Sequence, residues 1–368
     1  MSFEFPVYAR SGISLVRGEG YRVWDSDGKE YLDFYGGHAV ALLGYGNKEL
    51  AEAARAQADA LIFTSNAVEN PARSQACADL AAVAPAGLDR VFLVNSGTEA
   101  NENALKMAFW KTGRSRVVAL KGSFHGRTAG SAAATDGAEK WYGYPVRPFD
   151  VTFVSPEDIT ALEAALTEDV AAFIYEPIQG LGGAVSLSLE FMTRARELCT
   201  EKGIVMIADE VQCGTGRSGS WWASLVPPDL MTTAKGLAGG FPASAVLAPA
   251  AWADELPVGS LGTTFGAGPM ACAMISATLR QVTPELLSNV QRLSARIQAE
   301  VPVAEVSGRG FLLGLHMERP AREVLCELRE KGILAGDAKK PNVVRLLPPL
   351  ILDDAAVDQL VATLREIV

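Results

Sequence analysis

Positive charge, cysteine and histidine are all scarce in this sequence of 368 residues. Its 33 lysines and arginines are outnumbered by 43 aspartates and glutamates, so the formal net charge is -10. A protein that binds the phosphate backbone of nucleic acids needs a surplus of lysine and arginine on its contact face. We therefore expect no nucleic-acid partner.

The few cysteines and histidines exclude further classes. The five cysteines are odd in number and widely scattered, which favours reduced thiols over a disulfide framework, and the three histidines lie far from them, so no metal site is expected. No stretch is long and apolar enough to span a bilayer, and the start, MSFEFPVYARSG, lacks the segments of a signal peptide. The sequence thus predicts a soluble, cytoplasmic protein without a membrane partner.

What the sequence has is a globular composition, 49% hydrophobic and 21% charged, at a length that suits one large domain and a smaller one. From about residue 89, amphipathic helical patterns alternate with short apolar runs, at residues 91–95, 116–121, 151–155, 170–177, 203–211 and 244–249. These runs are apolar on both faces, as strands are when helices cover both sides of a parallel sheet. The pattern predicts an α/β fold.

The two ends of the chain have a different pattern. Residues 13–34 alternate apolar and polar side chains around an Asp27-Gly28 turn, which predicts an antiparallel hairpin. After a helix at 268–282, helices alternate with strands near 310–317 and 342–352. We infer a small α+β domain from residues 1–45 and 276–368, with a large domain at residues 46–275.

Three motifs could carry chemistry. The strand at 91–95 enters a helix through Ser96-Gly97-Thr98, where free amides suit a phosphate, although Ser96 and Glu99 also fit a capping box without any ligand. Asp209 and Glu210 end a buried strand, and ligands in open α/β sheets bind beyond the carboxyl ends of strands. A structural role is favoured for Glu210, whereas for Asp209 the two readings are balanced.

The third motif places Lys235 among small and apolar residues, where desolvation would lower its pKa toward that of an amine nucleophile, although most lysines are simply solvated. Arg345 is a cation within an apolar strand, which favours a bound carboxylate as its partner. In the loop at 123–127, His125 and Arg127 are equally well explained by ordinary hydrogen bonds, and so is His38.

In this order the motifs resemble the class III pyridoxal-phosphate-dependent aminotransferases, and most of all the acetylornithine aminotransferases. The resemblance covers nearly the whole chain, through LVNSGTEANENALK, SFHGRT, YEPIQG, IADEVQCGTGR, TTAKGLAGGFP and GTTFGAGP. It implies fold type I, the aspartate aminotransferase-like fold, with a large, mostly parallel sheet of the seven-stranded type. It also implies a bound pyridoxal 5'-phosphate.

The resemblance further implies a role for each matching residue. Lys235 would join the cofactor through an imine and later shuttle a proton, while Asp209 would face the pyridine nitrogen. The other residues implied to bind the cofactor are Ser96, Gly97, Thr98, Phe124, His125, Val211, Gln212 and Thr264. Among these, Thr264 would reach the phosphate of the neighbouring subunit, which implies a homodimer with shared active sites. Arg127 and Arg345 would bind the carboxylates of the substrates.

The implied reaction transfers the terminal amine of an N-acylated diamino acid, N-acetylornithine in the first instance, to 2-oxoglutarate, in arginine biosynthesis. One departure concerns the donor: Leu181 stands where ornithine-type members carry a glutamate that pairs with the arginine matching Arg345. Gly268 and Tyr45 are smaller departures. The alternatives are a succinylornithine, acyl-lysine or other omega-aminotransferase, or an aminomutase. A nucleotide-binding module is disfavoured because no G-x-G-x-x-G follows the first strand of the sheet.

Overall fold

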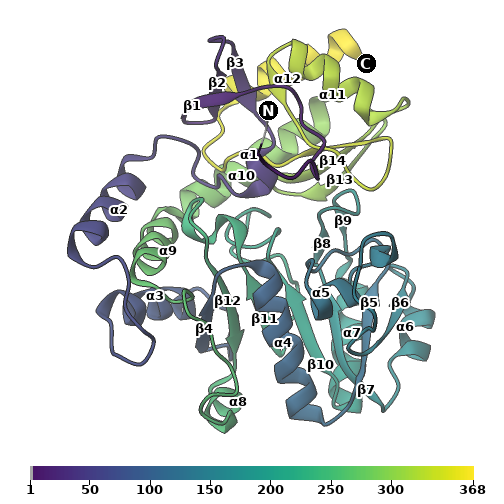
Figure 1. Cartoon of the computed structure of the whole chain (residues 1–368). Coiled ribbons are helices and arrows are strands. Elements are labelled where there is room, and N and C mark those ends of the chain that lie inside the picture. The colour runs from purple at the N-terminus through teal and green to yellow at the C-terminus, as the bar shows by residue number, and fades with distance from the viewer. Residues whose placement is uncertain (1–2) are drawn as a thin grey trace.

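A seven-stranded sheet forms the centre of the larger body of the protein (Figure 1). The computed structural model describes residues 3–368, so Met1 and Ser2, which begin the predicted segment 1–45, lie outside the described residues. The strand order is β4-β12-β11-β10-β7-β5-β6, and β12 alone runs antiparallel to its neighbours. The strands are β4 (Arg90–Val94), β5 (Arg116–Leu120), β6 (Asp150–Val154), β7 (Val170–Tyr175), β10 (Val205–Asp209), β11 (Leu230–Thr233) and β12 (Ser244–Ala248). The α/β, mostly parallel prediction is confirmed, and β11 is the strand that it missed.

Helices cover both faces of this sheet. Alternate residues of β5 enter two different cores: Val117 and Ala119 pack on the side of α4 (Gly97–Thr112), whereas Val118 and Leu120 pack on the side of α7 (Leu189–Lys202). The α7 side also holds α2 (Lys48–Ala60), α3 (Pro71–Ala82), α6 (Ile159–Ala165) and α9 (Pro269–Gln281). Burial on both faces explains why these strands read as continuous apolar runs.

The smaller body contains two further sheets. One has the order β1-β2-β3-β15, from β1 (Leu15–Glu19), β2 (Arg22–Asp25), β3 (Glu30–Asp33) and β15 (Ile333–Leu334); the other has the order β13-β14-β16, from β13 (Glu305–Arg309), β14 (Leu312–His316) and β16 (Val343–Leu346). Helices α10 (Pro284–Glu300), α11 (Ala321–Glu330) and α12 (Asp354–Ile367) complete this body. The predicted hairpin is β2-β3, and β1 adds a second antiparallel pair that the sequence analysis did not separate.

Both ends of the chain share one core in this body. Phe34 from the N-terminal part packs in the same cluster as Leu293, Val324 and Leu360 from the C-terminal part, and the purple and yellow ends of the ribbon meet there (Figure 1). The predicted boundaries at residues 45 and 275 stay predictions. No helix within residues 3–368 is both long enough and apolar enough to cross a membrane.

Short elements complete the chain, and some of them lie in the space between the two bodies. There α1 (Gly36–Ala39) contacts the 3-10 helix η2 (Lys235–Ala238), and the two-residue strand β9 (Val185–Ser186), which pairs with β8 (Ile178–Gln179), contacts β13. The others are α5 (Ala129–Ala133), the 3-10 helix η1 (Ala138–Lys140) and α8 (Ala250–Glu255), which packs on the α4 side of the sheet far from the smaller body (Figure 1). The carboxyl ends of β7, β10 and β11 all point toward this space, which is where open α/β sheets bind ligands.

Candidate active site

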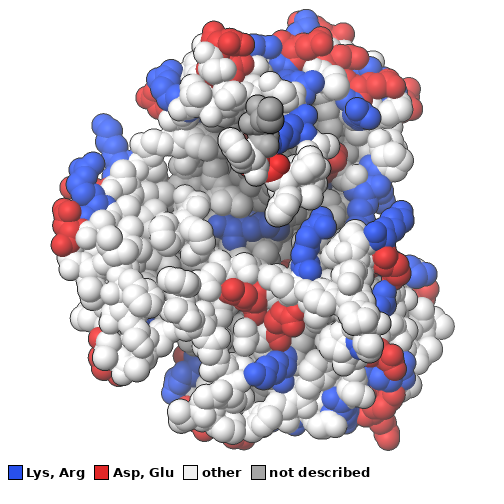
Figure 2. Space-filling model, viewed as in Figure 1, with Lys and Arg blue, Asp and Glu red and all other residues white. Residues whose placement is uncertain are grey.

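A cavity of about 490 Å³ lies at the carboxyl ends of β7, β10 and β11, beside the first turn of α4. Figure 2 shows this face of the molecule hollowed between the two bodies, with basic side chains in the hollow and at its edge. The cavity is lined by most of the residues that the sequence analysis selected, namely Ser96, Gly97, Thr98, Phe124, His125, Arg127, Asp209, Val211, Gln212 and Lys235. Arg345 and Thr264 do not line it.

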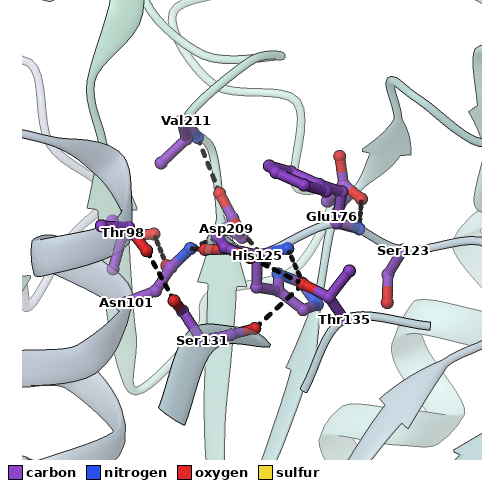
Figure 3. Close-up of polar contacts among 12 residues, drawn as sticks. Thr98, Asn101, Ser123, His125, Ser131, Thr135, Glu176, Asp209 and Val211 are labelled. Carbon is purple, nitrogen blue, oxygen red and sulfur yellow. Dashed lines mark hydrogen bonds and ion pairs between the residues drawn. The ribbon is translucent and has the colours of Figure 1, made fainter. Parts of the chain in front are cut away.

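Asp209 is the last residue of β10 and is 2% exposed. Its Oδ2 accepts hydrogen bonds from Asn101 Nδ2 and His125 Nδ1, both at 2.7 Å, and its Oδ1 accepts one from the Val211 N–H at 3.0 Å (Figure 3). Because an ionised carboxylate only accepts hydrogen bonds, Nδ1 is the protonated nitrogen of His125. Three donors therefore fix the carboxylate, and Oδ1 keeps acceptor capacity for a ligand.

Lys235 follows β11 and begins η2 with a φ of +48°, in the left-handed region that a residue with a side chain rarely adopts. Such strain costs about 1–3 kcal/mol and persists where the surrounding structure enforces it. Desolvation lowers the pKa of Lys235, an effect that the nearby carboxylates of Glu176 and Asp209 oppose. No described residue accepts a hydrogen bond from its amine, which is thus free to bind a ligand.

The start of α4 has the geometry of an anion site as well as a cap. The capping box is confirmed: the Glu99 N–H donates to Ser96 Oγ at 3.3 Å, and Glu99 Oε2 accepts from the Ser96 N–H at 3.3 Å. The amides of the first helical turn have no partner within the helix and lie at its positive end. Gly97 is required here because a Cβ would lie 2.7 Å from Val211 Cγ1.

Glu176 holds the loop that carries Phe124. Its Oε1 accepts from the Phe124 N–H at 2.8 Å and its Oε2 from the Gly180 N–H at 3.1 Å. Burial raises the pKa of Glu176, and the charge of Asp209 adds to this effect. In the sequence, Glu176 stands out only as part of the YEPIQG motif. It directly follows the buried strand β7, much as Asp209 ends β10, and this position could have identified it as a residue of the site.

The rest of that loop packs on α4. Gly126 has a φ of +145°, and a Cβ there would lie 1.9 Å from Thr98 Oγ1, so only glycine permits the approach. Beyond it, the exposed Arg127 guanidinium lies over the rings of Trp141, at 4.5 Å from the centroid, and Phe124, at 5.8 Å. This stacking leaves its charge at the mouth of the cavity.

Glu210 confirms the structural reading. Its carboxylate points away from the cavity lining and accepts the N–H groups of Ala223, at 2.8 Å, and Ser224, at 2.6 Å. Burial raises its pKa. Neighbouring acids at the end of β10 therefore serve different purposes, one fixing a loop and the other facing the cavity.

Arg345 lies in β16, is 2% exposed and is not part of the cavity lining, but it contacts Gln212, which is. Its Nε donates to the Asp337 carbonyl and its Nη1 to Gln212 Oε1 at 3.4 Å, and within residues 3–368 no carboxylate forms an ion pair with it. Burial lowers its pKa. A buried guanidinium without an acid is costly unless a ligand supplies the charge.

Two further candidates lie outside the lining. His38 adjoins the cavity, where the Tyr35 hydroxyl bonds its ring and Gln212 Nε2 donates to its carbonyl at 3.3 Å, and burial lowers its pKa. Thr264 is exposed on the loop before α9, away from the cavity of its own chain. Beside it, the exposed rings of Phe63 and Phe265 contact each other at 5.6 Å.

Comparisons with known proteins agree with this geometry. Residues 7–368 match the family model for class-III aminotransferases. The chain is 38% identical to the acetylornithine aminotransferase of Methanopyrus kandleri, over 99% of this chain and 96% of that protein. It is 38% identical to the [LysW]-aminoadipate semialdehyde transaminase of Deinococcus radiodurans, over 99% and 88%. The ornithine aminotransferase of Toxoplasma gondii, which holds pyridoxal phosphate at partial occupancy, superposes with a TM-score of 0.90 at 30% identity, covering 99% of this chain and 91% of that one.

Proposed function

The chain belongs to the class III aminotransferases, and we propose that it transfers the terminal amine of an N-acylated diamino acid, N-acetylornithine in the first instance, to 2-oxoglutarate. Family membership makes it a pyridoxal-phosphate-dependent aminotransferase. The observation that carries the proposal is one cavity that contains both the amine of Lys235 and the carboxylate of Asp209, beside a helix start. We also propose that the protein is cytoplasmic, since both proposed substrates are metabolites.

The residues around the cavity fit pyridoxal phosphate. The first amides of α4 suit its phosphate, Asp209 Oδ1 has room for the pyridine N–H, and Val211 and Phe124 can pack on the two faces of the ring. When bound, this cofactor supplies an aldehyde that combines with amines and a ring that withdraws electrons from the carbon bearing the amine. The side chains of the chain supply the remaining requirements.

Asp209 and Lys235 divide the acid–base work. A carboxylate beside the pyridine nitrogen favours the protonated form of that nitrogen, and His125 and Asn101 hold the carboxylate in place. The lowered pKa of Lys235 increases the share of its amine that is unprotonated and can act as a nucleophile. When it is not bound to the cofactor, the same amine can take the proton from the carbon that bears the amino group of the donor.

The two arginines suit the carboxylates of the substrates. A guanidinium binds a carboxylate through two parallel hydrogen bonds, which fixes its orientation. The unpaired charge of Arg345 supports a role in binding 2-oxoglutarate, and the exposed Arg127 suits a second carboxylate at the mouth. The apolar Leu181 cannot mask Arg345, so we propose that donors with a free α-carboxylate near the cofactor ring, on the carbon that bears the reacting amine, are accepted as well.

The exposed apolar residues near Thr264 support a homodimer. Ile62, Phe63 and Phe265 are 64%, 43% and 69% exposed, and an exposed apolar patch of this kind is typical of a protein interface. In the proposed dimer this face meets a second copy of the chain and Thr264 reaches the phosphate site of that copy. Sedimentation of the cofactor-loaded protein tests the assembly.

A half-reaction screen tests the proposed function. Purified protein loaded with pyridoxal phosphate is mixed with N-acetylornithine, N-succinylornithine, an N-acyl-lysine or ornithine, and the visible absorbance is followed. We expect N-acetylornithine to remove the absorbance fastest and 2-oxoglutarate to restore it with one glutamate formed per donor. The N-acyl-lysine tests the donor that the Deinococcus relative suggests. Turnover of a donor without consumption of an oxo acid would instead indicate an aminomutase.

A further inference from the structure

Asn101 is a buried amide on α4 that the family comparison does not single out. It is 1% exposed, and its Nδ2 donates to Asp209 Oδ2 and to the His125 carbonyl, both at 2.7 Å. Its Oδ1 accepts from the Thr232 hydroxyl, also at 2.7 Å. One side chain therefore links α4, the loop after β5, the end of β10 and strand β11, and Figure 3 shows it between Thr98 and Asp209.

These contacts decide which oxygen of Asp209 is left for a ligand. Asn101 and His125 both donate to Oδ2, whereas Oδ1 takes only the Val211 N–H. Loss of the amide would remove one of three donors from a buried carboxylate and would also leave the His125 carbonyl without its partner. His125 would then keep its backbone bond to Thr135 Oγ1 and its ring bond to Asp209.

We propose that Asn101 is a positioning residue of the aminotransferase reaction, which holds Asp209 with Oδ1 toward the cavity, and that Thr232 orients the Asn101 amide for this purpose. The proposal rests on the proposed function, in which Asp209 faces the pyridine nitrogen. Asn101 itself need not touch the cofactor ring. It acts through Asp209 and through the loop that carries Phe124.

The same helix offers a matched control. Asn103 is partly buried, and its Nδ2 donates to the Glu99 carbonyl within α4 at 2.8 Å. It therefore resembles Asn101 in residue type and helix position but contacts no part of the cavity. An effect of Asn101→Ala that Asn103→Ala lacks cannot come from the helix alone.

The experiment measures the dissociation constant of pyridoxal phosphate and the pH titration of its visible absorbance when bound. A hydrogen bond to a charged group predicts weakening by about 10- to 100-fold for Asn101→Ala, with a shifted titration. Thr232→Val, which keeps the volume and removes a neutral hydrogen bond, should weaken binding by about 3- to 10-fold. The other titratable groups that face Asp209 are His125, Glu176 and Lys235, and none of them is altered in these variants.

Two results would overturn the proposal. One is an Asn101→Ala protein that binds the cofactor and titrates like the unaltered protein; the other is a Thr232→Val protein indistinguishable from Asn103→Ala. If Asn101→Ala does not fold, as judged by thermal unfolding of the cofactor-free protein, Thr232→Val decides. Asp209→Asn is measured in parallel: if it too has no effect, the role of Asp209 fails, whereas an effect of Asp209→Asn alone refutes only the role of Asn101.

Discussion

The two ends of the active-site region are built differently. At the cofactor end, Asp209, Asn101 and His125 come from a strand end, a helix and a tight loop, and each is buried with hydrogen bonds of 2.7 Å. At the proposed substrate end, the Arg345 side chain bonds, within residues 3–368, only a backbone carbonyl and Gln212 Oε1 at 3.4 Å, and position 181, where the family resemblance implies a pairing acid, is a leucine. Buried hydrogen bonds therefore fix the residues that we propose for the chemical step, whereas the residue that we propose to bind the substrate makes few and long contacts.

Lys235→Ala should break the cofactor end completely. In the proposed function this amine is both the covalent link to the cofactor and the general base, so the variant should lose both, and general acid–base catalysis is worth up to about 10⁴-fold. We expect kcat for glutamate formation to fall by at least about 10⁴-fold. The visible absorbance after gel filtration reports the lost link. Lys340→Ala, an exposed lysine outside the cavity lining, is the control, and residual activity near the level of that control would contradict the role of Lys235.

Arg345→Met tests whether the substrate end binds through charge. Loss of a charge-assisted, two-pronged contact should raise KM for 2-oxoglutarate by about 10²-fold, with a smaller change in kcat. Arg345→Lys keeps the charge but cannot form two parallel hydrogen bonds, so its KM for 2-oxoglutarate should lie between those of the unaltered protein and Arg345→Met. Steady-state kinetics with varied oxo acid measure both parameters. An unchanged KM in Arg345→Met would remove the proposed contact with the oxo acid.

Leu181→Glu also tests the substrate end, by adding an acid instead of removing the charge of Arg345. If a glutamate at position 181 pairs with Arg345, as the family resemblance implies, it should compete with a carboxylate that lies on the carbon bearing the reacting amine. The preference for the terminal amine of N-acetylornithine over the α-amine of a donor such as alanine should then rise by about 10-fold. Leu181→Gln, with similar size and no charge, is the control. The ratio of kcat/KM for the two donors measures the effect. Strict selectivity in the unaltered protein, together with no response to Leu181→Glu, would show that the missing acid does not govern donor choice.

The sequence predicted most of the sheet and left one strand out. Runs such as residues 170–175 are apolar on both faces, so β7 could be recognised from its apolar sequence, and all of its residues are buried. Strand β11 has four residues, Leu230–Thr233, of which two are threonines, and neither its length nor its composition separates it from the loop that leads to Lys235. Its strand conformation comes from pairing with β10 and β12, which is tertiary information.

The site shows the same division. The position of Asp209 at a strand end and the capping pattern of Ser96 are local signals that made both residues candidates, and the family resemblance then implied their roles toward the cofactor. The contact between Asn101 and Asp209 joins residues 108 positions apart in the chain, and nothing near Asn101 in the sequence announces it. The role of Thr264 was implied by the family resemblance alone. It concerns the active site of a second subunit, so the contacts within one chain do not test it.

The smallest expected effect is a loss of stability caused by burial of the Lys235 amine. Folding lowers the pKa of Lys235 below its ordinary value of 10.5, so the unfolded chain binds more protons at every pH between the two values. The contribution of Lys235 to the free energy of unfolding of the cofactor-free protein should therefore rise with pH across this interval, as the penalty for burying the charged amine fades. Lys235→Met carries no such penalty. It should be more stable than the unaltered protein below the folded-state pKa, and this advantage should vanish as the pH approaches 10.5.

Urea denaturation of the cofactor-free proteins at several pH values measures the difference, with Lys340→Met as the exposed control. If the advantage of Lys235→Met is constant with pH, its source is apolar packing of the methionine and not relief of a buried charge. An advantage that falls with rising pH only for position 235 would show that the reactive amine is kept at the expense of stability. The unpaired Arg345 cannot imitate this result, because both proteins contain it and its charge is the same in each.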